Sequence, residues 1–566
     1  MKSRFFIVNS LCVLCVLCAL AHALDRNAFT FTKYQLTASI DPDQQRLGVR
    51  GIVTLRNDSS APQKNISLQI SSTLSWKSIQ FEGKSVEFLT HTYTSDIDHT
   101  GELSEAIVTL PSDIAPKQAI ELSIGYEGTI PRDATRLTRI GIPAETTRHT
   151  DWDQISPSFT AVRGIGYVVW YPVSTEAASL SDGNSVEKTV GRWKQRHSES
   201  SMDILFESTV DKTILFSGVA NLAEVNVPAD IVKIADFGMR RFGTDVPTFI
   251  IADYHKAAGD AISKVYWLKG HEQAAASLNK EVTDLQPTVR LYGFGGGIEI
   301  LDTPESGAAP FLSAHLMLIS FDSLLRDETK LTLVYALARA QIHSRRAWMQ
   351  EGLAHYAQAA YLEQERGRQA ALDYLNDHNA ELVESEKANS KSPQADHGSL
   401  LNGVDNIQFQ SKALRVWWML HDMLGPAGNP ALLLWHNYQF SEDQSPNYIQ
   451  KLIESKTHRD LQWFFDDWVY HDRGLPDFRI TSVFSSPMAS GGYLVTVTVQ
   501  NLGDAGAEVP VVLQIAGGDT THRLKVLANA KASIRFEVPA APKRATVNDG
   551  SVPESDMSNN SYVLEK

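Results

Sequence analysis

Cysteine is nearly absent from this chain of 566 residues. Its three cysteines, Cys12, Cys15 and Cys18, all lie in an amino-terminal stretch with the features of a secretory signal. Once that stretch is removed, the chain has no disulfide and no thiol chemistry. A cysteine nucleophile is therefore excluded. The G-x-S-x-G elbow of serine hydrolases is also missing, which excludes that class.

Residues 1–23 are predicted to be a signal peptide. Lys2 and Arg4 form a basic start, residues 11–20 an apolar core, and residues 21–23 a small-residue cleavage site. The pattern predicts a secreted, periplasmic or otherwise extracytoplasmic protein. The apolar run is short for a membrane-spanning helix, so the protein is expected at a membrane only if the signal stays uncleaved as an anchor.

Positive charge is also scarce. The 52 Lys and Arg residues are outnumbered by 66 Asp and Glu residues, which gives a formal net charge of -14, or -16 once Lys2 and Arg4 are removed. This balance argues against nucleic acid as a partner and provides no basic patch for anionic lipid. The chain is too long for one hydrophobic core, so several domains are expected.

Hydrophobic periodicity divides the remaining chain into three parts. The first, 24–252, is mainly β, because apolar and polar residues alternate, as they do from Tyr34 to Ile40. The second, 253–478, is mainly helical. The third, 479–566, alternates again and has the size and turn spacing of an immunoglobulin-like sandwich.

Within 253–478 the hydrophobic periodicity also predicts the individual helices, a strand and a loop. Residues 255–285 and 311–385 are predicted to be helical, with a short strand at 289–292 between them. A polar insert of low hydrophobicity, 386–406, is predicted to be a loop.

Two helical stretches, 331–341 and 348–356, indicate a function. Trp348-Met349-Gln350-Glu351-Gly352 resembles the W-[LM]-[NS]-E-G segment of the alanyl aminopeptidase family of gluzincin zinc metallopeptidases, with Glu351 at a zinc-ligand position. In that family an earlier helix carries H-E-x-x-H. At the matching positions this chain has Tyr335, Ala336 and Arg339.

Each of these substitutions removes part of the zinc chemistry. Two imidazoles four positions apart on a helix can reach one ion. Tyr335 instead offers a phenol with a pKa of about 10, and Arg339 is permanently cationic and has no lone pair to donate. Ala336 lacks the carboxylate that activates zinc-bound water. Arg339 is expected to take the vacated metal position and pair with Glu351, which would otherwise be an isolated buried charge.

The resemblance extends to further motifs. Gly296-Gly297-Ile298-Glu299 resembles G-x-M-E-N, which implies substrate binding by Glu299, Gly296 and Gly297; the alternative is an edge strand with one outward glutamate. Residues 409–414 resemble Y-x-K-G-A, and Gln410 replaces the tyrosine that stabilises the transition state there. Residues 166–172 resemble an aromatic-proline strand, and 461–477 resemble the F-F-x-x-W…G-x-P ending of the catalytic domain.

The resemblance implies a multidomain protein with an amino-terminal β-sandwich or saddle domain, a thermolysin-like α/β domain rich in helix, and a carboxy-terminal immunoglobulin-like β-sandwich. The predicted function is a catalytically degenerate pseudoenzyme that binds a peptide or protein without a metal cofactor. Two alternatives stay open. One is an active zinc aminopeptidase with Glu351, His355 and His343 as unconventional ligands. The other is a cell-surface scaffold that docks through its terminal β-domain.

Overall fold

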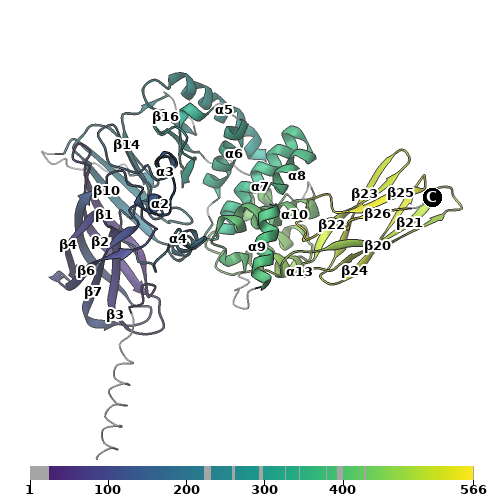
Figure 1. Ribbon diagram of the computed structural model, residues 1–566, viewed down its shortest axis with the longest axis horizontal. Coiled ribbons are helices and arrows are strands. Elements are labelled where there is room, and N and C mark those ends of the chain that lie inside the picture. The colour runs from purple at the N-terminus through teal and green to yellow at the C-terminus, as the bar shows by residue number, and fades with distance from the viewer. Residues whose placement is uncertain are drawn as a thin grey trace, which may run out of the picture. The chain divides into compact units, whose positions relative to one another are not determined.

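The structure, a computed structural model, describes residues 24–221, 231–257, 262–291, 297–324, 327–342, 344–377, 379–391, 399–425 and 429–564. The predicted signal peptide lies outside the described residues, as do Gly296 and His343. The chain divides into two compact units that meet between Tyr254 and His255, and each contains both sheets and helices (Figure 1). Within the described ranges, no helix is long and apolar enough to cross a membrane.

An eight-stranded sheet is the main layer of unit 1, residues 24–254. Its strand β1 (Phe29–Asp41) pairs antiparallel with β2 (Arg46–Asn57) and parallel with β10 (Ser201–Ser208). The predicted alternation along β1 is confirmed, because Tyr34 and Ile40 are buried on the same face. Across the sheet the order is β12 (Val219–Ala220), β13 (Lys233–Met239), β10, β1, β2, β8 (Ala119–Thr129), β4 (Leu74–Phe81) and β5 (Lys84–Ser85).

Two smaller sheets and three helices complete the described part of unit 1. One sheet has the order β3 (Gln63–Ser71), β7 (Glu102–Ile114), β6 (Glu87–Thr94), and the other β11 (Thr213–Phe216), β14 (Phe249–Ala252), β9 (Phe159–Val162). The helices are α2 (Thr135–Arg139), α3 (Ala144–Thr150) and α4 (Ser185–Arg196).

Residues 166–172 are not the strand that their resemblance implies. They form a turn and irregular backbone in the core, where Trp170 and Tyr171 are fully buried. Tyr126 donates its hydroxyl proton to the Trp170 carbonyl at 2.8 Å, and Tyr34 donates to the Pro172 carbonyl at 2.9 Å. Backbone donors satisfy further carbonyls, as the Ser71 amide does for Val169 at 2.7 Å, so the buried segment is hydrogen-bonded without forming a strand.

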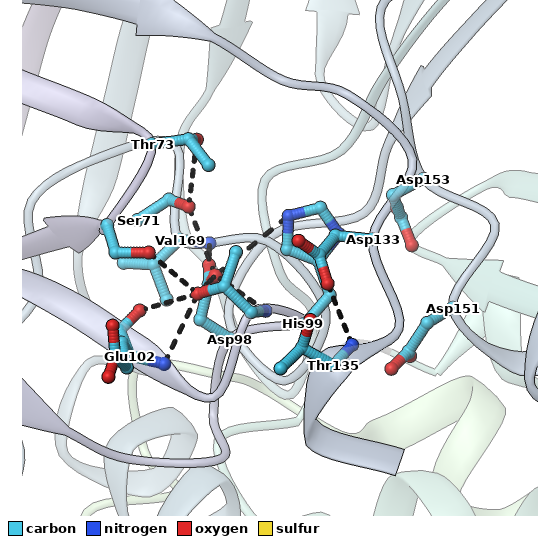
Figure 2. Close-up of polar contacts among 12 residues, drawn as sticks. Ser71, Thr73, Asp98, His99, Glu102, Asp133, Thr135, Asp151, Asp153 and Val169 are labelled. Atoms are coloured by element: carbon cyan, nitrogen blue, oxygen red, sulfur yellow. Dashed lines mark hydrogen bonds and ion pairs between the residues drawn. The ribbon is translucent and has the colours of Figure 1, made fainter. Parts of the chain in front are cut away.

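The loop between β6 and β7 is buried, and its polar side chains form a cluster around Asp98 (Figure 2). The Asp98 carboxylate accepts hydrogen bonds from Ser71 Oγ at 3.0 Å, from Thr100 Oγ1 at 2.9 Å and from the Val169 amide at 2.7 Å. The neighbouring His99 is fully buried, and its Nε2 lies 3.9 Å from Asp98. Neither ring nitrogen of His99 has a hydrogen-bond partner among the described residues. Asp98 thus fixes the loop against residues 166–172.

Unit 2, residues 255–564 of the described chain, begins with a five-stranded mixed sheet. Its order is β15 (His255–Lys256), β16 (Lys264–Trp267), β17 (Glu299–Asp302), β19 (Leu316–Ile319), β18 (Phe311–Ser313). Several sequence predictions were wrong here. Residues 255–267 contain β15 and β16 and only then the helix α5 (Glu272–Leu291), which includes 289–291, predicted as strand. Likewise 311–319 is strand and not helix.

Helices follow the sheet, and two of them carry the candidate site. They are α6 (Asp327–Gln341), α7 (Ala347–Arg366), α8 (Arg368–Asn376), α9 (Asn379–Lys391), the π-helical η3 (Gln408–Ala413), α10 (Leu414–Leu424), α11 (Pro430–Asn437), α12 (Tyr448–Thr457), α13 (Gln462–Phe465) and the π-helical η5 (Asp466–Tyr470). The prediction of a loop over 386–406 was therefore wrong for 386–391, which continue α9.

The chain ends in two sheets packed face to face. One has the order β20 (Phe478–Pro487), β21 (Tyr493–Asn501), β24 (Lys531–Val538), and the other β23 (Gly518–Val526), β22 (Ala507–Ile515), β25 (Pro542–Val547), β26 (Ser561–Val563). Val497 of β21 and Val511 of β22 are among the fully buried residues of this sandwich. They belong to the same hydrophobic core as the helices, so helices and sandwich share one interior.

Candidate functional site

The candidate site is a carboxylate held between two helices of unit 2. Tyr335 and Arg339 lie four positions apart on α6 and therefore on one face, and Glu351 lies in the second turn of α7. Arg339 Nε donates to Glu351 Oε1 at 2.8 Å, and the Tyr335 hydroxyl donates to Glu351 Oε2. The structure thus brings these three predicted residues together, with both carboxylate oxygens engaged.

Both partners of this ion pair are largely buried. Only 5% of the Arg339 side chain and 15% of the Glu351 side chain are exposed. Burial by itself raises the pKa of the Glu351 carboxyl. The charge of Arg339 and the hydrogen bonds from Tyr335 and Arg339 outweigh that effect, so this pKa lies below its usual range. Glu351 is therefore held as a carboxylate.

Ala336, at the position of the catalytic glutamate in the resembled family, is buried in the hydrophobic core of unit 2. Gln410 lies on the π-helical turn η3 and is half-buried. Within the described chain it makes no hydrogen bond to the Tyr335–Arg339–Glu351 cluster. Neither residue supplies an acid, a base or a hydroxyl to the cluster.

His355 lies one helical turn after Glu351 and borders the cluster. Its ring packs on the Tyr335 ring, with centroids 4.8 Å apart. Its Nδ1 lies 2.9 Å from Oε1 of Gln358, which also accepts a hydrogen bond from the Tyr374 hydroxyl at 2.6 Å. Gln358 and Tyr374 were not predicted from sequence; Gln358 follows His355 by three positions, a spacing that places both on one helix face.

Glu299 is the first residue of β17, which lies at the centre of its sheet; the edge-strand alternative was therefore wrong. Its Oε1 accepts a hydrogen bond from Lys264 Nζ at 2.9 Å, across the register pair of β16 and β17. Gly297 lies so close to the segment before β16 that a Cβ there would meet the Ile262 carbonyl at 2.1 Å. Among the described residues no hydrogen bond or ion pair joins Glu299 to the Tyr335–Arg339–Glu351 cluster.

The donor set at the cluster does not fit zinc. A guanidinium offers no lone pair, a neutral phenol is a poor ligand, and both oxygens of Glu351 accept hydrogen bonds. Among the residues that the structure describes, no group of three or more His, Cys, Asp or Glu side chains is arranged to hold a metal ion.

Comparison with known proteins gave structural matches only. No protein-family model matches the sequence, and no curated protein matches it. The similar solved structures include M1 zinc metallopeptidases. Two are crystal structures of a mutant from Deinococcus radiodurans, each 14% identical and aligned over 79% of this chain. The one bound to a Tyr-Ser-Ala substrate aligns over 96% of its own length with a TM-score of 0.49, and the other over 95% with a TM-score of 0.47.

Proposed function

We propose that this chain is a catalytically degenerate relative of the gluzincin aminopeptidases, an exported protein that binds a peptide or protein without cleaving it. The observation that carries the proposal is the cluster on α6 and α7. Arg339 and Tyr335 together occupy both oxygens of Glu351, the carboxylate at the expected zinc-ligand position.

The proposal follows from the chemistry of the replaced side chains. A peptidase of this class needs a metal to polarise the scissile carbonyl and a base to activate water. The Arg339 guanidinium places a fixed positive charge beside Glu351, so a divalent cation at that position would be repelled and would lack ligands. Ala336 cannot accept a proton, and Gln410 has no hydroxyl to stabilise an oxyanion.

Location and partner belong to the same proposal. The signal-like residues 1–23 support export to an extracytoplasmic compartment, with membrane attachment only if that segment is retained. The net charge of -14 supports a peptide or protein as ligand over nucleic acid. A peptidase-like fold that has lost its cleaving group can still bind such a ligand, because function belongs to the site and not to the fold.

A gain-of-function variant tests the assignment of the cluster. In Tyr335→His/Arg339→His two imidazoles face Glu351, and we expect the purified full chain to bind zinc stoichiometrically, as measured by elemental analysis and calorimetric titration. Because Ala336 is unchanged, we expect no aminopeptidase activity. Lys451→His/Ser455→His, on the exposed face of α12, carries the same pair without the facing Glu351 and should bind zinc far more weakly.

Two results would contradict the proposal. Stoichiometric zinc in the unmodified protein, with chelator-sensitive release of an aminoacyl fluorophore, would establish the active-enzyme alternative. Equal zinc affinity of the α6 variant and the α12 control would show that Glu351 does not face positions 335 and 339 as a third ligand.

A further inference from the structure

Strand β6 is one edge of the sheet β3–β7–β6 in unit 1, and its outer side has no partner strand in the described chain. It pairs with β7 over all eight residues, Glu87–Thr94, without a register shift. Six of these residues are exposed, and within the described ranges no backbone group of 87–94 is hydrogen-bonded outside the β6–β7 ladder. Alternate residues of an edge strand turn their amides and carbonyls away from the sheet, so β6 presents a row of backbone donors and acceptors to solvent.

The other edge strands of the described sheets are protected against pairing with a further chain. β5, β12 and β15 have two residues each, β18 and β26 three, and β9 and β11 four. β3 has a register shift near one end, and near the other its Gln69 and Ser71 amides donate to the carbonyls of Val173 and Val169. β20 has a bulge, and β23 and β24 carry charged side chains along their length.

Short length, cover, bulges and charges are the features by which sheets prevent strand addition, and β6 has none of them. Its residues 88–94, Phe-Leu-Thr-His-Thr-Tyr-Thr, include no lysine, arginine, acidic residue or proline. Threonine and the aromatic residues also favour the extended conformation. Among the edges that the structure describes, β6 is therefore the one suited to accept another strand.

Side-chain contacts hold β6 in place without a ligand. His91 Nε2 lies 3.1 Å from Oε2 of Glu105, which is fully buried on β7. The Arg26 guanidinium lies 4.3 Å from the centre of the Tyr93 ring, and its Nε donates to Glu105 Oε1 at 2.7 Å. A strand that is already extended and anchored loses little conformational entropy when it binds.

The charges around β6 indicate the chemistry of its partner. Leu89, which is 68% exposed, lies on the same side of the sheet as Glu87, because alternate residues share a side. On the opposite side, Glu102 is the register partner of Thr94. Glu87 and Glu102 are exposed at opposite ends of the strand, and neither has an ion pair within the described chain. The edge thus has an uncharged centre with a negative charge near each end.

These charges disfavour a second copy of this chain as the partner. Antiparallel pairing of β6 with itself would place Glu87 of each copy beside the end of the sheet that carries Glu102 of the other. Each copy also has a formal net charge of -14, which adds long-range repulsion. A segment with basic residues near its ends has the complementary charge.

We propose that β6 binds an extended peptide segment by antiparallel strand addition. The segment has uncharged, β-forming residues at its centre and a basic residue at each end, one beside Glu87 and one near Glu102. Backbone hydrogen bonds to β6 provide the affinity, and the two charges and Leu89 provide the selectivity. This site lies in unit 1 and does not depend on the Glu351 cluster or on the function proposed from it.

The test is calorimetric titration of the full chain with the peptide acetyl-KVTVTVTK-amide. In the antiparallel register its lysines lie opposite Glu87 and Thr94, and a valine lies opposite Leu89. We expect this peptide to bind, more weakly as salt is added, and the charge-reversed acetyl-EVTVTVTE-amide not to bind. Glu87→Gln should weaken binding about threefold, whereas Glu121→Gln, the same change on exposed β8, should have no effect.

Methylation of the peptide backbone tests the ladder itself. One peptide carries N-methyl groups on its three valines and another on its three threonines. The amides of one set point to β6 and those of the other set to solvent, so one peptide alone should lose binding, by about tenfold or more. Equal effects of the two methylation patterns would contradict strand addition.

A change on the protein locates the site. Leu89→Lys places a cation at the centre of β6 and should weaken binding of the lysine peptide about tenfold. Leu527→Lys makes the same change at a 45% exposed leucine of unit 2 and should have no effect. Equal binding of the two charged peptides, or no binding of either, would overturn the proposal. So would a dimer in sedimentation velocity that Leu89→Lys abolishes, because a second copy would then occupy β6.

Discussion

Glu351 is the residue on which the candidate site depends, because both Tyr335 and Arg339 donate hydrogen bonds to it. Its position facing Tyr335 and Arg339 could be predicted, since helical spacing puts positions 335 and 339 on one face and the resemblance to the aminopeptidase family implies that Glu351 faces them. The pairing of Glu299 with Lys264 could not be predicted. It depends on the register of β16 against β17, residues 35 positions apart, and no local pattern encodes that register.

Removal of the Arg339 charge should lower the stability of the fold, because the Glu351 carboxylate is then buried without a cation. In Arg339→Met the stem is kept and the charge is lost, so Glu351 remains buried without its ion pair. We expect the free energy of unfolding of unit 2 to fall by about 3 kcal/mol, measured by chemical denaturation. The double variant Arg339→Met/Glu351→Leu should recover much of that loss. A loss below about 0.5 kcal/mol for the single variant would show that the pair is solvated like a surface salt bridge.

The depressed pKa of Glu351 also predicts a pH dependence. The unfolded chain protonates this carboxyl near pH 4.3, as ordinary glutamate does, while the folded state keeps it charged to lower pH. The stability it contributes is therefore present above about pH 4.3 and is lost as pH falls through the lower folded pKa.

Denaturation of the full chain at a series of pH values measures this contribution. The stability difference between the unmodified protein and Glu351→Gln should shrink as the solution is acidified. The exposed Glu537→Gln serves as a control, and its difference from the unmodified protein should stay nearly constant. A Glu351→Gln difference that grew on acidification would contradict a depressed pKa.

At the scale of elements, the helices that carry the cluster were predicted, because residues 331–341 and 348–356 have long, unbroken helical periods. The short strands were not. β16 is only Lys264–Trp267, and its β-branched and aromatic residues were outweighed by the strong helical period that follows in α5. The opposite error concerns residues 289–291, predicted as strand, because α5 continues to Leu291 with Pro287 inside it, although proline usually ends a helix.

Gly352 decides how closely α7 approaches its neighbours. A Cβ at this position would lie 2.7 Å from the Ala413 Cβ and 3.0 Å from the Trp417 ring, so the contact of α7 with η3 and α10 requires a glycine. We expect Gly352→Ala to lower the free energy of unfolding by about 2 kcal/mol through overpacking, measured by chemical denaturation. Ala413→Gly in the same chain removes the facing methyl and should restore part of the loss. An unchanged stability in Gly352→Ala would mean that η3 can move away at no cost.

At the scale of the whole molecule, the helices and terminal sandwich of unit 2 are joined more tightly than their sequence patterns suggest. One hydrophobic core runs from Val265 to Val552. Arg415 of α10 is 1% exposed and donates to the carbonyl of Gly550 in the sandwich at 2.5 Å. Trp468 likewise donates to the Gly506 carbonyl at 2.8 Å. A change of hydrophobic period marks a boundary at 478/479 in the sequence, but it does not reveal that the two sides share an interior.

This shared core predicts which fragments fold. Residues 24–254 have their own buried sheets and should give a cooperative thermal transition when expressed alone. Residues 255–566 should do the same. Residues 255–478 should not, because loss of the sandwich exposes one side of the core and leaves Arg415 without its Gly550 acceptor. Calorimetry of the three fragments measures whether each one unfolds in a cooperative thermal transition. A cooperative transition of 255–478 would mean that 479–566 is an independent domain, and only then could the sandwich act alone as the docking module of a scaffold.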